Sequence, residues 1–134
     1  MVCVHCGQKT RVINSRAQLR TNQVWRRRKC LSCSTIISTN ERVDYDSTWA
    51  VRDASGNLAP FERDKLFMSL HSSCQHRPTA TADAAALTNT IIKKLLNTAK
   101  NGIIPSQTIT QAAQVALNRF DTAASVHYSA FHSK

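Results

Sequence analysis

Two Cys-x-x-Cys pairs limit what this chain can fold into more than any other feature of its sequence. Cys3 and Cys6 form the first pair, Cys30 and Cys33 form the second, and 23 residues lie between the pairs. Two such turns can close a tetrahedral shell of four thiolates around Zn²⁺, which lowers the pKa of the thiols so that they stay deprotonated. We therefore expect one structural zinc ion, with two disulfides or a redox pair as the alternatives.

The complete set of cysteines also indicates what the metal does. A shell of four thiolates has no open coordination position, so the zinc ion should organise the fold and not catalyse. His5 lies between two ligands and could replace one of them, but four cysteines make it a bystander. Residues 1–46 contain few large apolar side chains, and a segment of this kind needs a staple in order to fold.

Three short strands are predicted around the cysteine pairs. Residues 11–16 and 23–29 read as strands that are joined by a turn near Thr21 and Asn22, and residues 35–39 form a third strand after the second pair. Small three-stranded sheets that carry cysteine pairs at their turns are zinc ribbons. The sequence therefore predicts a zinc ribbon at the N-terminal end.

Positive charge is concentrated in the same segment. The net charge is +10, and residues 1–40 carry eight Lys and Arg side chains but no carboxylate. Residues 47–134 carry nine cations and five acids. This asymmetry predicts a head that binds a polyanion on a separate, milder body, although a merely soluble basic surface is the alternative.

The stretch VWRRRKCLSC, residues 24–33, holds four consecutive cations. Strand alternation places Arg26 and Arg28 on one face and Trp25, Arg27 and Lys29 on the other, so neither face can be fully buried. A DNA groove suits such a strand, because arginine can reach phosphate oxygens or guanine edges. A solvated edge strand guarded against aggregation is the alternative. For Trp25, packing and base stacking are both open. Arg16 and Arg20 add positive charge on the preceding segment.

The rest of the chain has a different pattern. Residues 48–52 and 58–59 are predicted to form a short β-hairpin, and the remainder about four helices. The first helix carries an apolar stripe of Leu66, Leu70 and Cys74. We expect the first helix between Phe61 and Pro78 and the second over residues 81–100, with Gly102 as its C-cap. The third helix should begin after the N-cap Ser106. The fourth should begin after the cap Asp121, with Ala124, His127 and Phe131 facing inward.

Several classes of protein are disfavoured. No apolar run approaches the roughly 20 residues of a membrane span, and the N-terminus MVCVHCGQKT lacks the pattern of a secretory signal. The expected location is therefore the cytoplasm, with no membrane partner. No Ser-His-Asp order, paired carboxylate or phosphate-binding Gly-rich loop is visible, so the chain is not expected to be an enzyme.

The motifs together resemble a known family, the NrdR-type transcriptional repressors of bacterial ribonucleotide reductase genes. The resemblance lies in the two cysteine pairs, in Arg11-Val-Ile-Asn-Ser-Arg16, in Val24-x-Arg-Arg-Arg-x-Cys30 and in Thr39-x-Glu-Arg-Val43. The body, from Val51-Arg52 to Pro60-Phe61-x-Arg63-x-Lys65-Leu66, resembles the ATP-cone domain of these repressors. The match follows the domain order of the family over nearly the whole chain.

The resemblance implies an α+β protein with two domains. Residues 1–46 would be a zinc ribbon that binds paired operator boxes in double-stranded DNA, with the metal on the four cysteines. DNA contact would fall on Arg26, Arg27 and Arg28, with Arg16 and Lys29 as further candidates. Residues 47–134 would be an ATP-cone of a hairpin and about four helices that binds ATP or dATP. It further implies a homo-oligomer associated with the nucleoid, in which the bound nucleotide changes the oligomeric state and thereby the DNA affinity.

The resemblance also implies a nucleotide site. Arg52 on the first strand and Lys65 on the first helix would contact phosphate, and Ala50 and Val51 would line the adenine side. From the residues alone, ordinary exposed charge is the alternative for both cations. The chain departs from the family pattern in a longer hairpin turn, in Ala59 and Glu62 around Phe61, and in Ser34 in place of a common Gly.

The leading hypothesis is thus a zinc-dependent repressor of ribonucleotide reductase genes that responds to ATP and dATP. A second hypothesis is a nucleotide-sensing regulatory module whose ribbon docks on a protein partner. An RNA-binding ribbon is a third, which the lack of clustered exposed aromatic residues disfavours.

Overall fold

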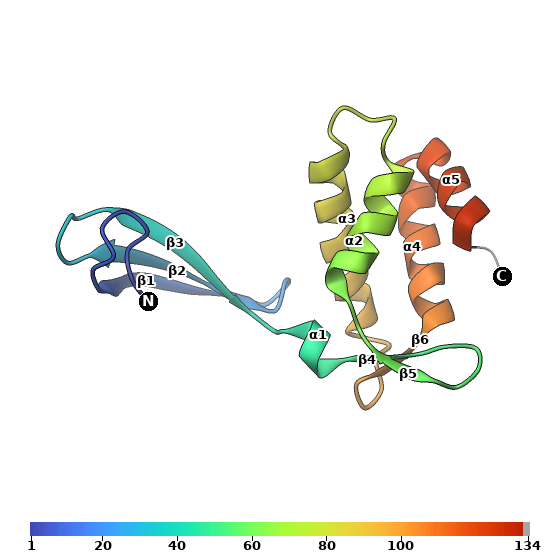
Figure 1. Ribbon diagram of the computed structural model, residues 1–134, viewed down its shortest axis with the longest axis horizontal. Helices are drawn as coiled ribbons and strands as arrows, with labels where there is room; N and C mark the ends of the chain where they lie inside the picture. Colours follow the sequence, from blue (N-terminus) through green and yellow to red (C-terminus); the bar gives the residue numbers. More distant parts are fainter. Residues whose placement is uncertain (133–134) are drawn as a thin grey trace. The chain divides into compact units, whose positions relative to one another are not determined.

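The computed structural model describes residues 1–132 of the chain (Figure 1). They divide into two compact units, Met1–Val43 and a second unit that begins at Asp44. The first unit is a small antiparallel sheet, and the second is mostly helical with a sheet of its own, so the expected α+β class is confirmed. No helix among these residues combines the length and the apolar character needed to cross a bilayer.

The first unit contains the three predicted strands, each in antiparallel pairing with its neighbour. They are β1 (Thr10–Gln18), β2 (Gln23–Cys30) and β3 (Ile36–Arg42), in the order β1-β2-β3. The turn between β1 and β2 contains Asn22 with φ 50°, a backbone conformation that Asn tolerates better than most residues. Because β2 pairs with both other strands, it is the central strand, and its run of cations lies between β1 and β3.

Strand β1 carries a β-bulge that the sequence does not reveal. Val12 pairs with Arg28 and Asn14 pairs with Arg27, so Ile13 is an extra residue without a partner. Directly paired residues of antiparallel strands share a face of the sheet. The bulge therefore shifts the alternation by one residue, as β-bulges do when they re-aim side chains.

The second unit begins with two short elements. Helix α1 (Tyr45–Thr48) leads into β4 (Ala50–Arg52), which pairs with β5 (Leu58–Pro60) as the predicted hairpin. The longer hairpin turn is ordered by Asp53, whose Oδ1 accepts the backbone N–H groups of Ser55 and Asn57, each at 2.9 Å. Gly56, at φ +85°, completes this turn. The extra residues thus form an ordered connection.

Four longer helices complete the second unit: α2 (Arg63–Ser73), α3 (Ala80–Leu95), α4 (Ser106–Phe120) and α5 (Thr122–His132). A third strand, β6 (Ile103–Pro105), was not predicted; it lies parallel to β4 and makes β4 the central strand. The predicted stripe of Leu66, Leu70 and Cys74 is buried as expected. It packs in a core whose largest other members are Trp49, Phe61, Leu87, Ile91, Leu95, Ile104, Leu117 and Tyr128.

Two helix ends differ from the prediction, and β6 is the reason. Helix α3 ends at Leu95, and Gly102 is not its C-cap but a turn residue at φ +73° before β6. A Cβ at Gly102 would lie 3.1 Å from the carbonyl oxygen of Thr48, so the position favours glycine on both counts. Ser106 is the first residue of α4 and not its N-cap, because the strand runs through Pro105 directly into the helix.

Helix α5 presents a different face from the one expected. Asp121 caps it as predicted, since its Oδ1 accepts the backbone N–H of Ala124 at 3.0 Å. Ala124 and Tyr128, four residues apart, are buried, whereas His127 is exposed and Phe131 is 74% exposed. The prediction that His127 and Phe131 face inward was therefore wrong, because the larger Tyr128 defines the buried stripe.

Candidate functional site

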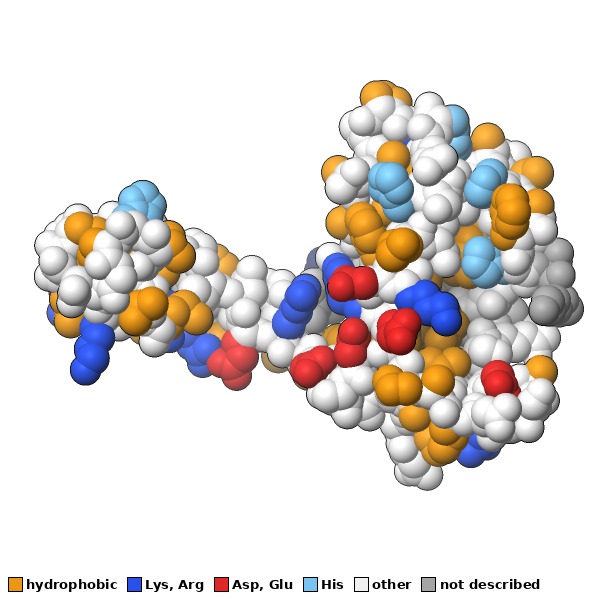
Figure 2. Space-filling view, viewed as in Figure 1, with side chains coloured by type: hydrophobic (Ala, Val, Ile, Leu, Met, Phe, Trp, Pro, Cys, Tyr) orange, Lys and Arg blue, Asp and Glu red, His pale blue; other side chains and the backbone are white. Residues whose placement is uncertain are grey.

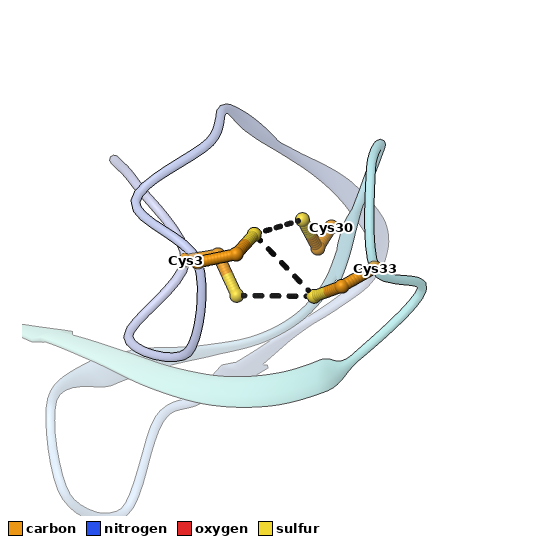
Figure 3. A group of neighbouring side chains, drawn as sticks. Cys3, Cys30 and Cys33 are labelled. Carbon is orange, nitrogen blue, oxygen red and sulfur yellow. Dashed lines mark hydrogen bonds between the residues drawn. The ribbon is translucent and has the colours of Figure 1, made fainter.

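The four paired cysteines converge on one point of the first unit. Their Sγ atoms all lie within 4.8 Å of one another (Figure 3). The Sγ atom of Cys33 is 3.7 Å from that of Cys3 and 3.5 Å from that of Cys6, which is 3.5 Å from that of Cys30. A tetrahedron of thiolates with Zn–S bonds of about 2.3 Å has sulfur–sulfur distances of about 3.8 Å. The cluster therefore fits a zinc ion without rearrangement.

Backbone turns hold the sulfur atoms in place. In the first turn, the N–H of His5 donates to the Sγ atom of Cys3 at 3.4 Å, and in the second the N–H of Ser32 donates to that of Cys30 at 3.4 Å. Gly7 completes the first turn at φ +71°, and Ser34 completes the second at φ +60°. A serine in this left-handed backbone region costs about 1 kcal/mol, and metal binding must offset that cost. The side chain of His5 is not part of the cluster.

The thiols affect one another because they are so close. Hydrogen bonds with the side chain and backbone of Thr35 lower the pKa of Cys33 to about 6. The backbone N–H of Gln8 lowers the pKa of Cys6, but the neighbouring thiols of Cys30 and Cys33 outweigh it and raise that pKa to about 12. Four thiolates cannot coexist at this distance without a cation, so metal binding must displace protons.

The two faces of the first sheet differ in whether their cations form ion pairs or hydrogen bonds with other residues of the sheet. Arg26 forms an ion pair with Glu41, which lowers the pKa of that carboxyl group. The Nη1 atom of Arg28 donates to the Thr10 hydroxyl at 3.4 Å, while its Nε is buried without a partner among the described residues. Val12 and Ile37 pair with Arg28 on the same face. The cations of this face are therefore tied to the ribbon itself.

The other face carries the row Gln18–Gln23–Arg42 near the turn between β1 and β2 and, next to it, three rows of paired side chains that are here called the basic face. The register gives them as Arg11–Lys29–Ile36, Asn14–Arg27–Ser38 and Arg16–Trp25–Asn40. Within residues 1–132, no ion pair or side-chain hydrogen bond engages any of these residues. Glu41, the single acid of residues 1–43, lies on the opposite face. Figure 2 shows Lys and Arg side chains along the ribbon, whereas acidic side chains gather mainly on the second unit.

The structure thus divides the five cations expected to contact DNA. Arg16, Arg27 and Lys29 belong to the basic face, and Arg26 and Arg28 to the opposite one. Alternation along β2 predicts this division of its own residues correctly. Arg11 lies before the bulge and Asn14 and Arg16 lie after it, so only the bulge brings all three to one face. Sequence reasoning therefore missed Arg11 and Asn14.

The residues expected to bind nucleotide lie at one end of the second unit. Ala50 and Val51 are half-buried on β4, and Val51 packs against the core. Arg52 ends β4 and Lys65 is in the first turn of α2, and both are exposed. A hollow of about 370 Å³ lies in the first unit between Ala17, Leu19 and Val43. None of the four expected residues lines it.

The N-terminus of α2 is already occupied by an internal carboxylate. Asp46 Oδ1, on α1, accepts the backbone N–H of Arg63 at 3.1 Å. Glu62, at the N-cap position, makes no capping bond with its side chain. Sequence reasoning missed Asp46, because 17 residues separate it from Arg63 and no local pattern connects the two.

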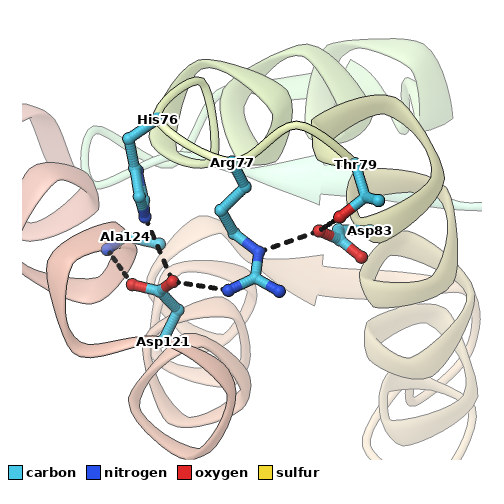
Figure 4. A network of polar contacts seen from close by, with 6 residues as sticks. All are labelled: His76, Arg77, Thr79, Asp83, Asp121 and Ala124. Carbon is cyan, nitrogen blue, oxygen red and sulfur yellow. Dashed lines mark hydrogen bonds and ion pairs between the residues drawn. The ribbon is translucent and has the colours of Figure 1, made fainter.

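A polar network joins the loop between α2 and α3 to the junction of α4 and α5 (Figure 4). The Oδ2 atom of Asp121 accepts a hydrogen bond from Nη1 of Arg77 at 2.9 Å and lies 3.1 Å from the Nε2 atom of His76. Arg77 Nε donates to Asp83 at 2.9 Å, and its guanidinium lies 4.5 Å from the ring centre of Phe120. This network closes the helical unit at the end away from β4.

Comparison with known proteins assigns the family. Residues 1–41 match the zinc ribbon that forms the N-terminal domain of NrdR-like transcriptional repressors. The repressor NrdR of Pelotomaculum thermopropionicum is 34% identical over 98% of this chain and 79% of its own length. The NrdR of Symbiobacterium thermophilum is 31% identical over 98% of this chain and 87% of its own length. The NrdR of Streptococcus gordonii is 36% identical over 77% of this chain and 66% of its own length.

The chain belongs to the NrdR family of transcriptional repressors. NrdR-family proteins are regulators and not enzymes, in agreement with the sequence analysis. The family match ends at residue 41, so it covers both cysteine pairs, β1, β2 and all of β3 except its last residue. The four-cysteine cluster of this NrdR-family chain is accordingly the structural zinc site of its ribbon.

Proposed function

We propose that this NrdR-family chain is a zinc-dependent repressor that responds to ATP and dATP and binds operator boxes upstream of ribonucleotide reductase genes. The observation that carries the proposal is the basic face, whose cations form no ion pair within residues 1–132, on a sheet whose end is fixed by four cysteines. Zinc holds the strands in register, and the register brings Arg16, Arg27 and Lys29 to one surface. A surface of this charge suits the phosphate backbone of DNA.

The nucleotide site is proposed at the four residues that resemble the ATP-cone. Arg52 and Lys65 would hold phosphate oxygens, and Ala50 and Val51 would pack against adenine. The exposure of both cations and the apolar character of β4 support this arrangement. Since dATP is a product of the pathway that ribonucleotide reductase supplies, dATP should favour the DNA-binding assembly and ATP should oppose it.

The working form is proposed to be a homo-oligomer, because paired operator boxes require more than one ribbon. The second unit carries nearly balanced charge, with nine cations and seven acids from Asp44 onward. This balance would permit copies to approach one another through that unit, whereas the strongly basic ribbon would repel its own copies unless DNA neutralises it.

Gel-shift titration tests the function as a whole. Zinc-loaded protein is titrated against a duplex taken from upstream of a ribonucleotide reductase gene, with no nucleotide, with ATP or with dATP, while mass is followed in parallel. We expect retention of the duplex with dATP and weaker retention with ATP. A protein that ignores the duplex and instead captures a reductase subunit would support the second hypothesis, a ribbon that docks on protein.

Replacement of Asp46 by Asn should strengthen ATP binding. Asp46 places a negative charge at the N-terminus of α2, where a phosphate would also bind. Removal of that charge should lower the Kd for ATP by about two- to fivefold, as measured by calorimetry. Glu41→Gln, the same change of charge in the ribbon, is the control and should leave the Kd unchanged. If Asp46→Asn weakens ATP binding in a protein with unaltered circular dichroism, the carboxylate does not compete with phosphate.

A further inference from the structure

The basic face has an internal order that goes beyond its charge. Its middle row, Asn14–Arg27–Ser38, is made of an amide, a guanidinium and a hydroxyl, whereas Arg11 and Lys29 lie in one outer row and Arg16 in the other. The middle row therefore carries hydrogen-bonding groups suited to base edges, and cations lie at both ends. Ser38 and Asn14 are exposed, as is Arg27, the most exposed of the Arg26–Arg28 run.

The spacing of the rows agrees with the dimensions of duplex DNA. Lys29 and Trp25 are four residues apart on β2, which corresponds to about 13 Å along a strand. The major groove of B-form DNA is about 12 Å wide. If the strands cross the groove, each outer row lies near one phosphate backbone and the middle row lies over the base edges.

We propose that the basic face, and not the face of Arg26 and Arg28, enters the DNA major groove, with Asn14, Arg27 and Ser38 reading bases. Arg11, Arg16 and Lys29 hold the two phosphate backbones. Arg27 is suited to guanine through its O6 and N7 atoms, and Asn14 to adenine through N6 and N7. The inference rests on the proposed function, since it specifies how the ribbon binds DNA.

The opposite face lacks the features that this role requires. Its Arg26 is neutralised by Glu41, and a phosphate that approached Arg26 would also meet this carboxylate. Val12 and Ile37 flank Arg28 on either side, and apolar aliphatic side chains offer nothing to phosphate. The bulge at Ile13 moves Asn14 and Arg16 off this face and onto the basic face.

Arg26→Ala and Arg27→Ala form a matched pair that tests the choice of face. The two residues are adjacent in sequence and lose the same charge, but they lie on opposite faces. Duplexes retained from a random-sequence pool by the wild-type protein serve as probes, and zinc content is measured for each variant. We expect Arg27→Ala to weaken binding by about 10- to 100-fold and Arg26→Ala by no more than about twofold. An equal loss in both variants, or a larger loss for Arg26→Ala, would overturn the assignment and leave DNA binding itself intact.

Selection from the same pool tests the reading of bases. The Asn14→Ala variant should lose its preference at one base pair of the selected sequences and keep the others, because only one contact is removed. Lys29→Ala should instead weaken all duplexes alike and reduce the slope of log affinity against log salt by about one unit. A set of selected sequences that Asn14→Ala leaves unchanged would remove Asn14 from base reading. If the wild-type protein retains no duplex, the proposed function fails as well.

Trp25 provides an independent readout, because it lies on the basic face between Arg16 and Asn40. In a Trp49→Phe variant, which removes the other tryptophan, bound duplex should protect Trp25 from quenching by iodide. Phe should fit at position 49, where the residue packs edge-on against Phe61. Unchanged quenching of Trp25 in a protein that binds duplex would show that DNA covers the opposite face.

Discussion

Removal of zinc should unfold the ribbon and abolish DNA binding, while the helical unit stays folded. Residues 1–43 contain two buried side chains, Cys3 and Cys30, and both are metal ligands. The first unit therefore has no apolar core that could hold its strands without the metal. The second unit has a separate core around Phe61 and Leu70 that does not involve the cluster. In circular dichroism, chelation should leave the helical signal and remove the β contribution.

Substitution of one ligand gives the same test without a chelator. Cys30→Ser should lose zinc, and its affinity for duplex DNA should fall to the background of an unstructured basic peptide. His5→Ala, between the ligands Cys3 and Cys6, should retain full zinc content and is the control. Zinc binding should also weaken as the pH falls, since protons compete for the thiolates. Full operator binding by a metal-free protein would contradict the account of the ribbon given above.

Replacement of Asp121 by Asn should destabilise the helical unit. The backbone N–H of Ala124, followed by His76 and Arg77, holds the pKa of Asp121 well below its ordinary value. A carboxyl group with a depressed pKa stabilises the fold fully at pH values above the unfolded pKa, about 4. That stabilisation is lost as the pH falls below this value toward the folded pKa. At neutral pH the melting temperature of Asp121→Asn should therefore be several degrees lower.

The pH dependence distinguishes this network from a general effect of charge. The gap in melting temperature between the wild-type protein and Asp121→Asn should narrow as the pH falls from 5 to 2, because the unfolded wild-type chain then takes up a proton on Asp121 that the folded protein does not. Asp64→Asn changes an acid that is 90% exposed and should leave the melting curve nearly unaltered. A gap that stays constant over this range would mean that the charge of Asp121 does not stabilise the fold.

The features that could be predicted from the sequence are those that depend on residues close together in the chain. The cysteine spacing predicted the metal cluster, and alternation along β2 predicted the two sides on which Arg26 and Arg27 lie. The stripe through Leu66 and Leu70 predicted α2, because helical periodicity is a local property. All of these features can be recognised within one element or one motif.

What was missed depends on pairing between distant segments. Strand β6 is three residues long, and only its pairing with β4 makes it a strand. The capping of α2 by Asp46 likewise connects two elements that are separated by a hairpin. The inward face of α5 was wrongly predicted because two helical stripes were possible, and packing of Tyr128 decided between them.

The extra residue in β1 has a consequence for how this ribbon tolerates change. The side chain of Ile13 pairs with nothing across the sheet, so its chemical identity should be free to vary. Its presence matters more, because loss of one residue there would rotate Asn14 and Arg16 to the other face of the sheet, while every residue that we propose to contact DNA remained in the sequence. The number of residues in β1 is therefore under tighter constraint than the identity of residue 13. A single deletion there should abolish DNA recognition although all the proposed contact residues are retained.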